Sequence, residues 1–186
     1  AKSVWQHHGF DSLEITEEDK EILKEGQLDF VSFSYYRSNT VKKDDPWFNV
    51  GGSSNPYLEN TPWGWPVDPL GLRHCMNEIY DRIQKPIFIV ENGMGAIDEA
   101  DENGYVEDDY RIEFVRDHLE WIAKAIEDGA NCLGYHYWGV IDNWSWCNAF
   151  KNRYGFIRVC LDDGYKRKEK KSASWIREVA RTNEFE

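Results

Sequence analysis

The chain has 186 residues, with 34 acidic side chains against 22 basic ones and a formal net charge of -12. This acidic balance argues against a nucleic acid or an anionic membrane as the partner, because both repel a negatively charged surface. No run of about eighteen apolar residues is present and the amino terminus has no signal-peptide core, so the composition predicts one soluble, cytoplasmic domain.

Aromatic residues and cysteines bear on the kind of ligand. Aromatic side chains make up 15% of the chain, and several of its nine tryptophans gather in stretches 63–65 and 138–146. Such clusters either pack in a core or stack on the apolar faces of sugar rings. The four cysteines form no C-x-x-C pair, so we expect reduced, packed thiols and neither a metal site nor a cofactor. They are Cys75, Cys132, Cys147 and Cys160.

The first predicted elements are a helix, a strand and a long loop. Residues 15–27 (ITEEDKEILKEGQ) predict a helix, with Thr16 at its amino-terminal cap and Gly26 at its end. Residues 28–36 (LDFVSFSYY) predict a strand rich in aromatic side chains. The polar stretch 39–66 predicts a loop, and a loop of that length in a compact domain is functional or disordered.

Helices and strands alternate over the rest of the chain. The expected helices are 68–84, 108–130 and 170–181, the expected strands are 85–90 and 132–141, and a hairpin is expected around 153–167. Gly129 closes the second of these helices. Its predicted core-facing stripe is Ile112, Val115, Leu119, Ile122 and Ile126. The basic run at 165–171 (YKRKEKK) is interpreted as a solvated turn, because its charges are of mixed sign.

This alternation predicts the fold class. Strands that alternate with helices are typical of parallel βα units, in which helices bury both faces of the strands. An eight-stranded βα barrel needs roughly 200 residues or more, so three such units cannot close one. We therefore expect an α/β chain that is either part of a larger barrel or an open three-stranded piece.

An acid directly follows the apolar stretch KPIFIV. Functional residues of parallel sheets lie at the carboxyl ends of strands, which here offer Tyr35 with Tyr36, Glu91 with Asn92, and Trp138. A carboxylate at the end of a buried strand loses hydration, so Glu91 needs a partner or a chemical task. The alternative is a structural carboxylate that accepts bonds from backbone amides.

Five stretches together carry a resemblance to a known family. IFIVENGMGA resembles the strand-seven signature of glycoside hydrolase family 1, and FSYYRS is similar to its strand-six segment. YHYWGVIDNWSWCNAFKNRYGF resembles its strand-eight segment and the loop beyond, and GWPVDPLGL and DDYRIEFVRDHL match stretches between these signatures in the right order. The resemblance runs from about Thr16 onward. It implies that residues 1–186 are the carboxyl-terminal part of one (β/α)8 TIM-barrel domain, with strands six to eight and their helices.

The resemblance also implies roles for single residues. Glu91 would be the nucleophile of a retaining glycosidase, and Tyr36 would be the tyrosine that hydrogen-bonds it and aims it. Trp138 would lie beneath the sugar ring in the cleaved subsite. Trp65 is similar to an aromatic residue that lines the entrance of the site.

Ser145 bears on the substrate. Ordinary β-glucosidases of the family have a Glu here, in NFEW, whereas this chain reads NWSW. A Glu would repel a 6-phosphate and a Ser can donate to it, as in the phospho-glycosidases of the family, which add a Lys and a Tyr. Tyr154 matches that Tyr, and Lys151 stands one position before the usual Lys, where this chain has Asn152. A lysine has a flexible stem, so we expect Lys151 to reach the phosphate.

The expected activity is therefore hydrolysis of 6-phospho-β-glucosides, such as phosphorylated cellobiose or aryl glucosides. Trp146 resembles the phospho-galactosidase version as much as the phospho-glucosidase one, which leaves the sugar configuration open. An unphosphorylated β-glucosidase and a non-catalytic remnant that binds sugar phosphates also stay open as functions.

The resemblance places the family's acid/base Glu in an NEP motif on strand four, and residues 1–186 contain no such motif. Asp142 is a candidate replacement, but an orienting role is expected for it. The amino-terminal half of the barrel is then absent, and the chain alone is expected to be inactive. Open sheet edges predict self-association, a complementing amino-terminal fragment, or disorder in 39–62.

Overall fold

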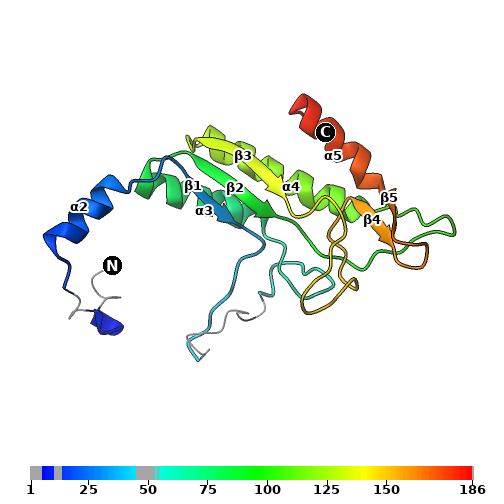
Figure 1. Cartoon of the computed structure of the whole chain (residues 1–186), viewed down its shortest axis with the longest axis horizontal. Coiled ribbons are helices and arrows are strands. Elements are labelled where there is room, and N and C mark those ends of the chain that lie inside the picture. Colours follow the sequence, from blue (N-terminus) through cyan, green and yellow to red (C-terminus); the bar gives the residue numbers. More distant parts are fainter. Residues whose placement is uncertain (1–5, 11–13, 45–52, 54, 186) are drawn as a thin grey trace.

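The computed structural model describes residues 6–10, 14–44, 53 and 55–185. Its elements run in the following order (Figure 1): α2 (Glu17–Glu25), β1 (Val31–Ser34), α3 (Pro69–Ile83), β2 (Ile87–Asn92), α4 (Asp109–Glu127), β3 (Cys132–Tyr137), β4 (Ile157–Cys160), β5 (Lys166–Glu169) and α5 (Lys171–Thr182). The predicted helices and strands are therefore present. The bounds of the three strands in the sheet differ from those predicted: β1 covers 31–34 instead of 28–36, β2 covers 87–92 instead of 85–90, and β3 covers 132–137 instead of 132–141. The pairing of β1 with β2 is irregular between Phe33 and Ser34.

A parallel sheet of β1, β2 and β3, in that order, forms the centre of the fold. Val31 aligns with Ile87 in the first pair of strands, and Ile87 aligns with Cys132 in the second. Helix α3 connects β1 to β2, and α4 connects β2 to β3. The α/β class with parallel βα units is thus confirmed, and the carboxyl ends of all three strands lie at one edge of the sheet.

The main core lies between this sheet and helices α3 and α4, which pack against each other (Figure 1). Its buried members are Tyr35, Leu72, Met76, Ile87, Ile89, Ile122, Ala125 and Ala130. The expectation that helices bury both faces of every strand is wrong for β1 and β3, neither of which has a fully buried residue and both of which have exposed ones. The described helices cover one face of the sheet, so only β2 alternates fully buried with half-buried residues along its first four positions.

Local sequence signals set the ends of the helices. Thr16 and Asp19 form a reciprocal capping box at the start of α2. Asp68 accepts a hydrogen bond of 3.0 Å from the backbone amide of Gly71 at the start of α3. Beyond α4 the chain turns at Gly129, whose φ of +110° favours glycine. The predicted stripe of α4 is wrong at its last member, since Ile126 is 49% exposed.

A second buried cluster supports the loops beyond the sheet. Its buried members are Met94, Ala96, Phe114, Val115, Phe156 and Ala173. The antiparallel hairpin of β4 and β5 borders this cluster and confirms the expected hairpin. The basic run 165–171 was predicted to be a solvated turn. The solvated part of that prediction is confirmed for most of 165–169, which are exposed, but it is wrong in two respects: 166–169 form the strand β5, and Lys170 is almost fully buried.

Two further expectations can be compared with the structure. All four thiols are free, but the prediction of packed thiols is wrong for Cys147, which is exposed. The prediction of disorder in 39–62 falls partly on 45–52 and 54, which lie outside the described residues.

None of the described helices combines the length and the apolar character that crossing a bilayer requires.

Candidate active site

Glu91 is the last residue but one of β2, because the strand continues to Asn92. It therefore lies within the strand and not directly after it. Its backbone carbonyl accepts a bond of 2.8 Å from the amide of Tyr35, which continues the sheet past β1. The hydroxyl of Tyr36 donates to Oε2 of Glu91 at 2.9 Å. Burial, followed by this bond to the carboxylate, raises the pKa of Tyr36. Tyr36 therefore remains a donor that fixes one carboxylate oxygen and leaves the other free.

Asn92 holds the three strand ends together. Its side-chain amide is fully buried and donates to the carbonyl of Tyr35 at 2.7 Å, while its oxygen accepts from the hydroxyl of Tyr135 at 2.7 Å. The amide of Trp138 donates to the backbone carbonyl of Asn92 at 2.7 Å. Only glycine fits next, because a Cβ on Gly93 would lie 2.2 Å from the carbonyl oxygen of Trp138. These contacts bring the ends of β1, β2 and β3 to one place.

A pocket of about 590 Å3 opens at these strand ends. Seven of the eight predicted site residues line it, and Lys151 does not; the lining residues are Tyr36, Trp65, Glu91, Gly93, Gly95, Trp138, Asn143, Trp144, Ser145, Trp146, Cys147 and Tyr154. Trp65 packs edge-on against the ring of Tyr36 at 5.9 Å between ring centroids. Trp138 is 43% exposed, so part of its indole is available to a ligand.

Part of the pocket wall comes from the loop between β3 and β4. Ser145 and Ala149 exchange two backbone hydrogen bonds, of 2.9 and 2.8 Å, and so close a tight turn. Trp146, in that turn, is 99% exposed and has no fixed partner ring among the described contacts. Lys151 is exposed, and its backbone amide donates to Asn148. The structure thus brings Ser145 to the pocket and leaves the Lys151 side chain outside its lining.

Asn152, rather than Lys151, contacts the predicted anion-binding tyrosine. Its amide nitrogen donates to the hydroxyl of Tyr154 at 2.7 Å, so the proton of that hydroxyl is free to point elsewhere. The oxygen of the same amide is buried without a partner. It lies against Gly95, where an added Cβ would come within 1.9 Å of it. The loop that follows Glu91 and the loop that carries Tyr154 are therefore in direct contact.

Asp142 is not available for acid/base chemistry. Its side chain is buried, and Oδ1 accepts from the Lys170 ammonium and the Gly155 amide, each at 2.9 Å. Its Oδ2 pairs with Arg153 at 3.2 Å. The orienting role expected for Asp142 agrees with this geometry. Among the described residues that line the pocket, Glu91 is the one carboxylate. No described group of His, Cys, Asp or Glu is arranged to hold a metal ion.

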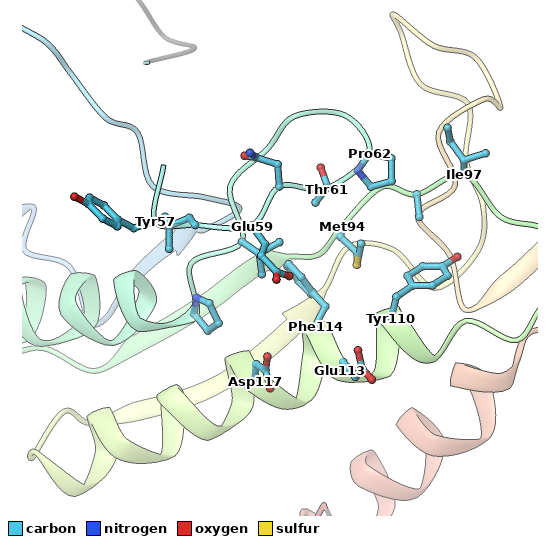
Figure 2. A pocket seen from close by; sticks show the side chains of 15 residues that line it. Tyr57, Glu59, Thr61, Pro62, Met94, Ile97, Tyr110, Glu113, Phe114 and Asp117 are labelled. Atoms are coloured by element: carbon cyan, nitrogen blue, oxygen red, sulfur yellow. The ribbon is translucent and has the colours of Figure 1, made fainter. Parts of the chain in front are cut away.

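A different pocket, of about 580 Å3, lies between residues 57–62, Met94 and helix α4 (Figure 2). Its wall is mostly apolar, and its carboxylates are Glu59, Glu113 and Asp117. Burial, followed by neighbouring carboxylates, raises the pKa of Asp117. None of the predicted site residues lines this pocket, and the hydroxyl of Tyr110 in its wall donates to Asp98 instead of to one of these three acids. The predicted site residues thus line the pocket of Glu91 and not this one.

Sequence reasoning missed several residues that shape the site. Gly95 and Asn152 contact each other across two loops, and Arg111 lies beneath both loops. The two glycines of ENGMGA could have indicated the contact of Gly95, since closely spaced glycines are typical of positions where other atoms approach the backbone closely. No sequence signal pointed to Arg111. It lies in α4, and the apolar stripe of that helix already accounted for the residues expected to face the core. Only the fold shows that this arginine is fully buried.

Comparisons with known proteins show the family of the chain. The model of the family described as Glycosyl hydrolase family 1 matches residues 2–185. The chain is 46% identical over 182 residues to the aryl-phospho-beta-D-glucosidase BglH of Bacillus subtilis (strain 168), covering 92% of this chain and 39% of the relative. It is 50% identical over 182 residues to a 6-phospho-beta-glucosidase of Clostridium longisporum, covering 90% of this chain and 38% of the relative.

Solved structures show the same relationship in space. A beta-glucosidase from Thermotoga maritima in complex with noeuromycin superposes with a TM-score of 0.82 at 28% identity, covering all of this chain and 42% of that one. The family 1 b-glucosidase from the same organism gives a TM-score of 0.79 at 30% identity, over 92% of this chain and 39% of that one. The chain thus has the fold of part of a (β/α)8 barrel and spans about two fifths of the length of its relatives. It belongs to glycosyl hydrolase family 1.

Proposed function

We propose that this chain supplies the nucleophile and the phosphate-binding wall of an enzyme that hydrolyses 6-phospho-β-glucosides with retention. The bond from Tyr36 to Glu91, at 2.9 Å and inside a pocket lined by Trp138, is the observation that carries the proposal. A carboxylate with one oxygen fixed and one free can attack an anomeric carbon from below a sugar ring. Relatives named for phosphorylated glucosides support the substrate class.

The phosphate is assigned to the wall that Ser145 and Tyr154 form. Both line the same pocket as Glu91, and Asn152 donates to the hydroxyl of Tyr154. That hydroxyl can then give its own proton to a phosphate oxygen, as can the hydroxyl of Ser145. Lys151 remains a predicted phosphate ligand that would have to swing into the pocket. We also propose a cytoplasmic location, where the fixed negative charge of such a substrate would keep it from leaving across the lipid bilayer unaided.

Retention needs a second carboxyl group about 5 Å from the nucleophile. Glu91 is the one carboxylate among the described lining residues, and Asp142 is held by Lys170 and Arg153. We therefore propose that the acid/base comes from a segment outside these 186 residues, which would make residues 1–186 the carboxyl-terminal part of a single barrel domain. That the chain spans 38% to 39% of two of its relatives supports this view.

A fusion enzyme tests the proposal. The amino-terminal segment of the Clostridium longisporum relative would be joined to this chain, in place of the segment that the chain matches. We expect the fusion to hydrolyse a chromogenic 6-phospho-β-glucoside with a kcat/KM about a hundredfold or more above that for the unphosphorylated glucoside. Glu91→Gln should abolish turnover of both without unfolding the protein. Equal rates on the two substrates would reject the phosphate assignment, and turnover by the Gln variant would reject the nucleophile.

An unphosphorylated β-glucosidase is the second candidate, because the Lys151 side chain does not line the pocket and the solved neighbours are named beta-glucosidases. The phosphorylated and unphosphorylated glucosides used above distinguish the two candidate functions. The corresponding galactosides, run in parallel, settle the preferred sugar configuration.

A further inference from the structure

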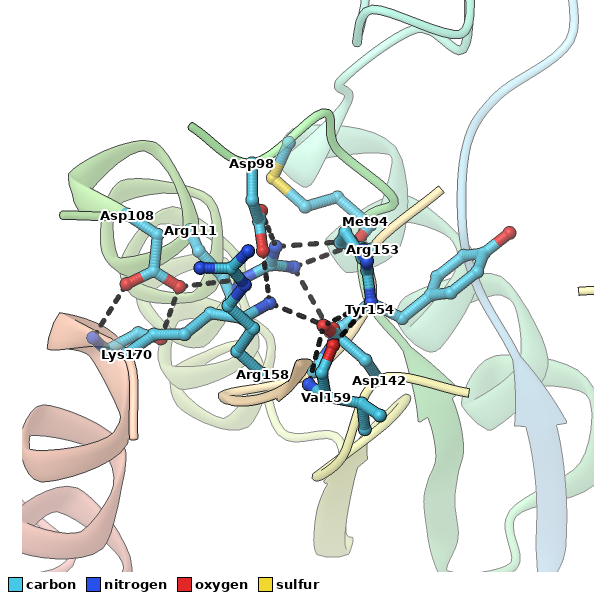
Figure 3. A network of polar contacts seen from close by, with 12 residues as sticks. Met94, Asp98, Asp108, Arg111, Asp142, Arg153, Tyr154, Arg158, Val159 and Lys170 are labelled. Atoms are coloured by element: carbon cyan, nitrogen blue, oxygen red, sulfur yellow. Dashed lines mark hydrogen bonds and ion pairs between the residues drawn. The ribbon is translucent and has the colours of Figure 1, made fainter. Parts of the chain in front are cut away.

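Arg111 is the most heavily bonded side chain in the described structure, and it lies outside the pocket. It comes from the first turn of α4, on the outer layer of the fold, and its side chain is fully buried. Its Nε donates to Oδ2 of Asp108 at 3.0 Å. Figure 3 shows the guanidinium surrounded by backbone and carboxylate oxygens from several segments.

Two of these segments carry pocket residues. Nη1 of Arg111 donates to the backbone carbonyl of Met94 at 2.9 Å, three residues after Glu91, and to the carbonyl of Tyr154 at 3.1 Å. Nη2 donates to the carbonyl of Arg153 at 3.2 Å. One planar group therefore holds the loop after the predicted nucleophile and the loop of the predicted phosphate-binding tyrosine at a set separation.

A third segment is joined through Tyr137, the last residue of β3. Its hydroxyl accepts from Nη1 of Arg111 at 2.8 Å, and Trp138 follows directly in the chain. The guanidinium thus contacts neighbours of Glu91, Trp138 and Tyr154 at once. Its own position is fixed by Asp108, which also accepts from the amide and hydroxyl of Ser172 at 2.8 and 2.6 Å.

The surrounding charges are balanced. Nη2 of Arg111 pairs with Asp98 at 3.3 Å, and Lys170 bridges Asp98 and Asp142 at 2.5 and 2.9 Å. Arg153 completes the set through Asp142 at 3.2 Å. Three buried or nearly buried cations therefore face three buried carboxylates, Asp98, Asp108 and Asp142. Such a network tolerates few arrangements, because any shift leaves a buried charge without its partner.

We propose that Arg111 is a positioning residue, which sets the distance between the Glu91 nucleophile and the Tyr154 wall so that a substrate anchored by its phosphate presents its anomeric carbon to Glu91. This proposal rests on the proposed function. Neither Glu91 nor Tyr154 depends on Arg111 for its own chemistry. What depends on Arg111 is their relative placement, which matters more for a substrate held at both ends than for one held at the sugar alone.

Arg111→Lys tests the proposal, because a lysine keeps the charge but cannot reach Asp108, Met94 and Tyr154 together. The matched control is Arg73→Lys, which alters a bidentate pair with Asp128 that joins α3 to α4 on the surface. Hydrogen exchange of the 186-residue chain is the first measurement. We expect exchange in 93–98 and 152–156 to rise about tenfold or more in Arg111→Lys, with 87–89 unchanged, and neither loop to change in the control.

Selectivity in the fusion enzyme is the second measurement. Arg111→Lys should lower the ratio of kcat/KM for phosphorylated over unphosphorylated glucoside about tenfold, mainly through KM for the phosphorylated substrate. A purely structural role would lower kcat for both substrates alike and leave the ratio unchanged, which would overturn the proposal. Unchanged exchange in the two loops would also overturn it. An unmodified fusion without phosphate preference would instead reject the proposed function, and the exchange result would still decide the placement of the loops.

Discussion

In the proposed function, Ser145 is the residue that decides whether a phosphate can bind in the Glu91 pocket, which both residues line. Its backbone is fixed by the paired bonds with Ala149, so its side chain cannot retreat far from a ligand. We predict that Ser145→Glu in the fusion enzyme lowers kcat/KM for the phosphorylated substrate about a hundredfold, because a carboxylate beside a phosphate costs several kcal/mol at close range. Activity on the unphosphorylated glucoside should be retained or should rise.

Ser145→Ala is the matched control for that change. It removes a donor to a charged group without adding a charge, so the loss should be about ten- to thirtyfold and confined to KM. Selectivity for the phosphorylated substrate that survives Ser145→Glu would show that the phosphate binds elsewhere in the pocket.

Gly95 matters at the same scale for a steric reason. A methyl group there would meet the Asn152 amide oxygen at 1.9 Å, so Gly95→Ala should displace the amide that donates to Tyr154. We predict a stability loss of about 1–3 kcal/mol, as for other overpacked sites, and a several-fold higher KM for the phosphorylated substrate. Kinetics and thermal unfolding of the fusion enzyme measure the two effects.

Asn152→Ala separates the two causes, because it removes the donor without a clash. A KM effect shared by both variants assigns it to the bond between Asn152 and Tyr154. A KM effect in Gly95→Ala alone would assign it to displaced backbone and would contradict a role for that bond.

At the scale of elements, sequence patterns predicted what local interactions determine. Helices α2 and α3 begin directly after their capping residues, Thr16 and Asp68. Each of these residues bonds a partner only three positions further along the chain, Asp19 and Gly71. The order of the strands could also be predicted from their alternation with helices, but their ends could not, since β1 ends at Ser34 instead of 36 and β2 continues to Asn92 instead of 90.

Burial of single charged residues could not be predicted from the same patterns. Lys170 lies in a basic run that is typical of a solvated turn, yet its partners Asp98 and Asp142 are distant in sequence and reach it only after folding. The contacts of Asn152 could not be predicted for a similar reason, because its partner Gly95 is distant in sequence and meets the Asn152 amide only after folding. Residue periodicity reports which face of an element is apolar, and it does not report which loops meet beyond the sheet.

Helix α4 carries a histidine that should make the stability of the chain depend on pH. His118 is fully buried between Phe114 and Tyr35, and its Nδ1 lies 2.7 Å from the carbonyl of Phe114. Burial lowers the pKa of His118 from 6.5 to about 4. The unfolded chain therefore binds a proton below pH 6.5 that the folded chain does not, and the free energy of unfolding should fall as the pH drops from 6.5 to 4.

The expected loss is about 3 kcal/mol over that range, and it levels off once the folded state is also protonated. Urea unfolding of the chain at several pH values measures it. The other four histidines, His7, His8, His74 and His136, are exposed and are kept in the variant described next. His118→Phe keeps a ring in the core and should flatten the profile between pH 6.5 and 5. An equally steep profile in that variant would exclude His118 as the cause.

At the scale of the whole molecule, apolar side chains and strand edges are left uncovered. Helix α2 has no buried residue, and it projects away from the sheet (Figure 1). Several large apolar side chains are exposed in and just after α2, namely Ile22, Leu23, Leu28 and Phe30. Leu133 on β3 is exposed as well. Strands β1 and β3 each have one described neighbour in the sheet, so each presents a free edge. Such surfaces favour association with another chain.

We predict that the 186-residue chain alone self-associates and does not hydrolyse a 6-phospho-β-glucoside, because its pocket has one carboxylate among the described lining residues. A separately produced amino-terminal fragment of the Clostridium longisporum relative should convert it to a one-to-one complex and restore turnover. Light scattering and the chromogenic assay measure both effects, with Glu91→Gln in this chain as the control that associates but stays inactive. If the chain is a monodisperse monomer and does not bind the fragment, the exposed edges do not drive association. If the chain is fully active without the fragment, no second carboxyl group is missing.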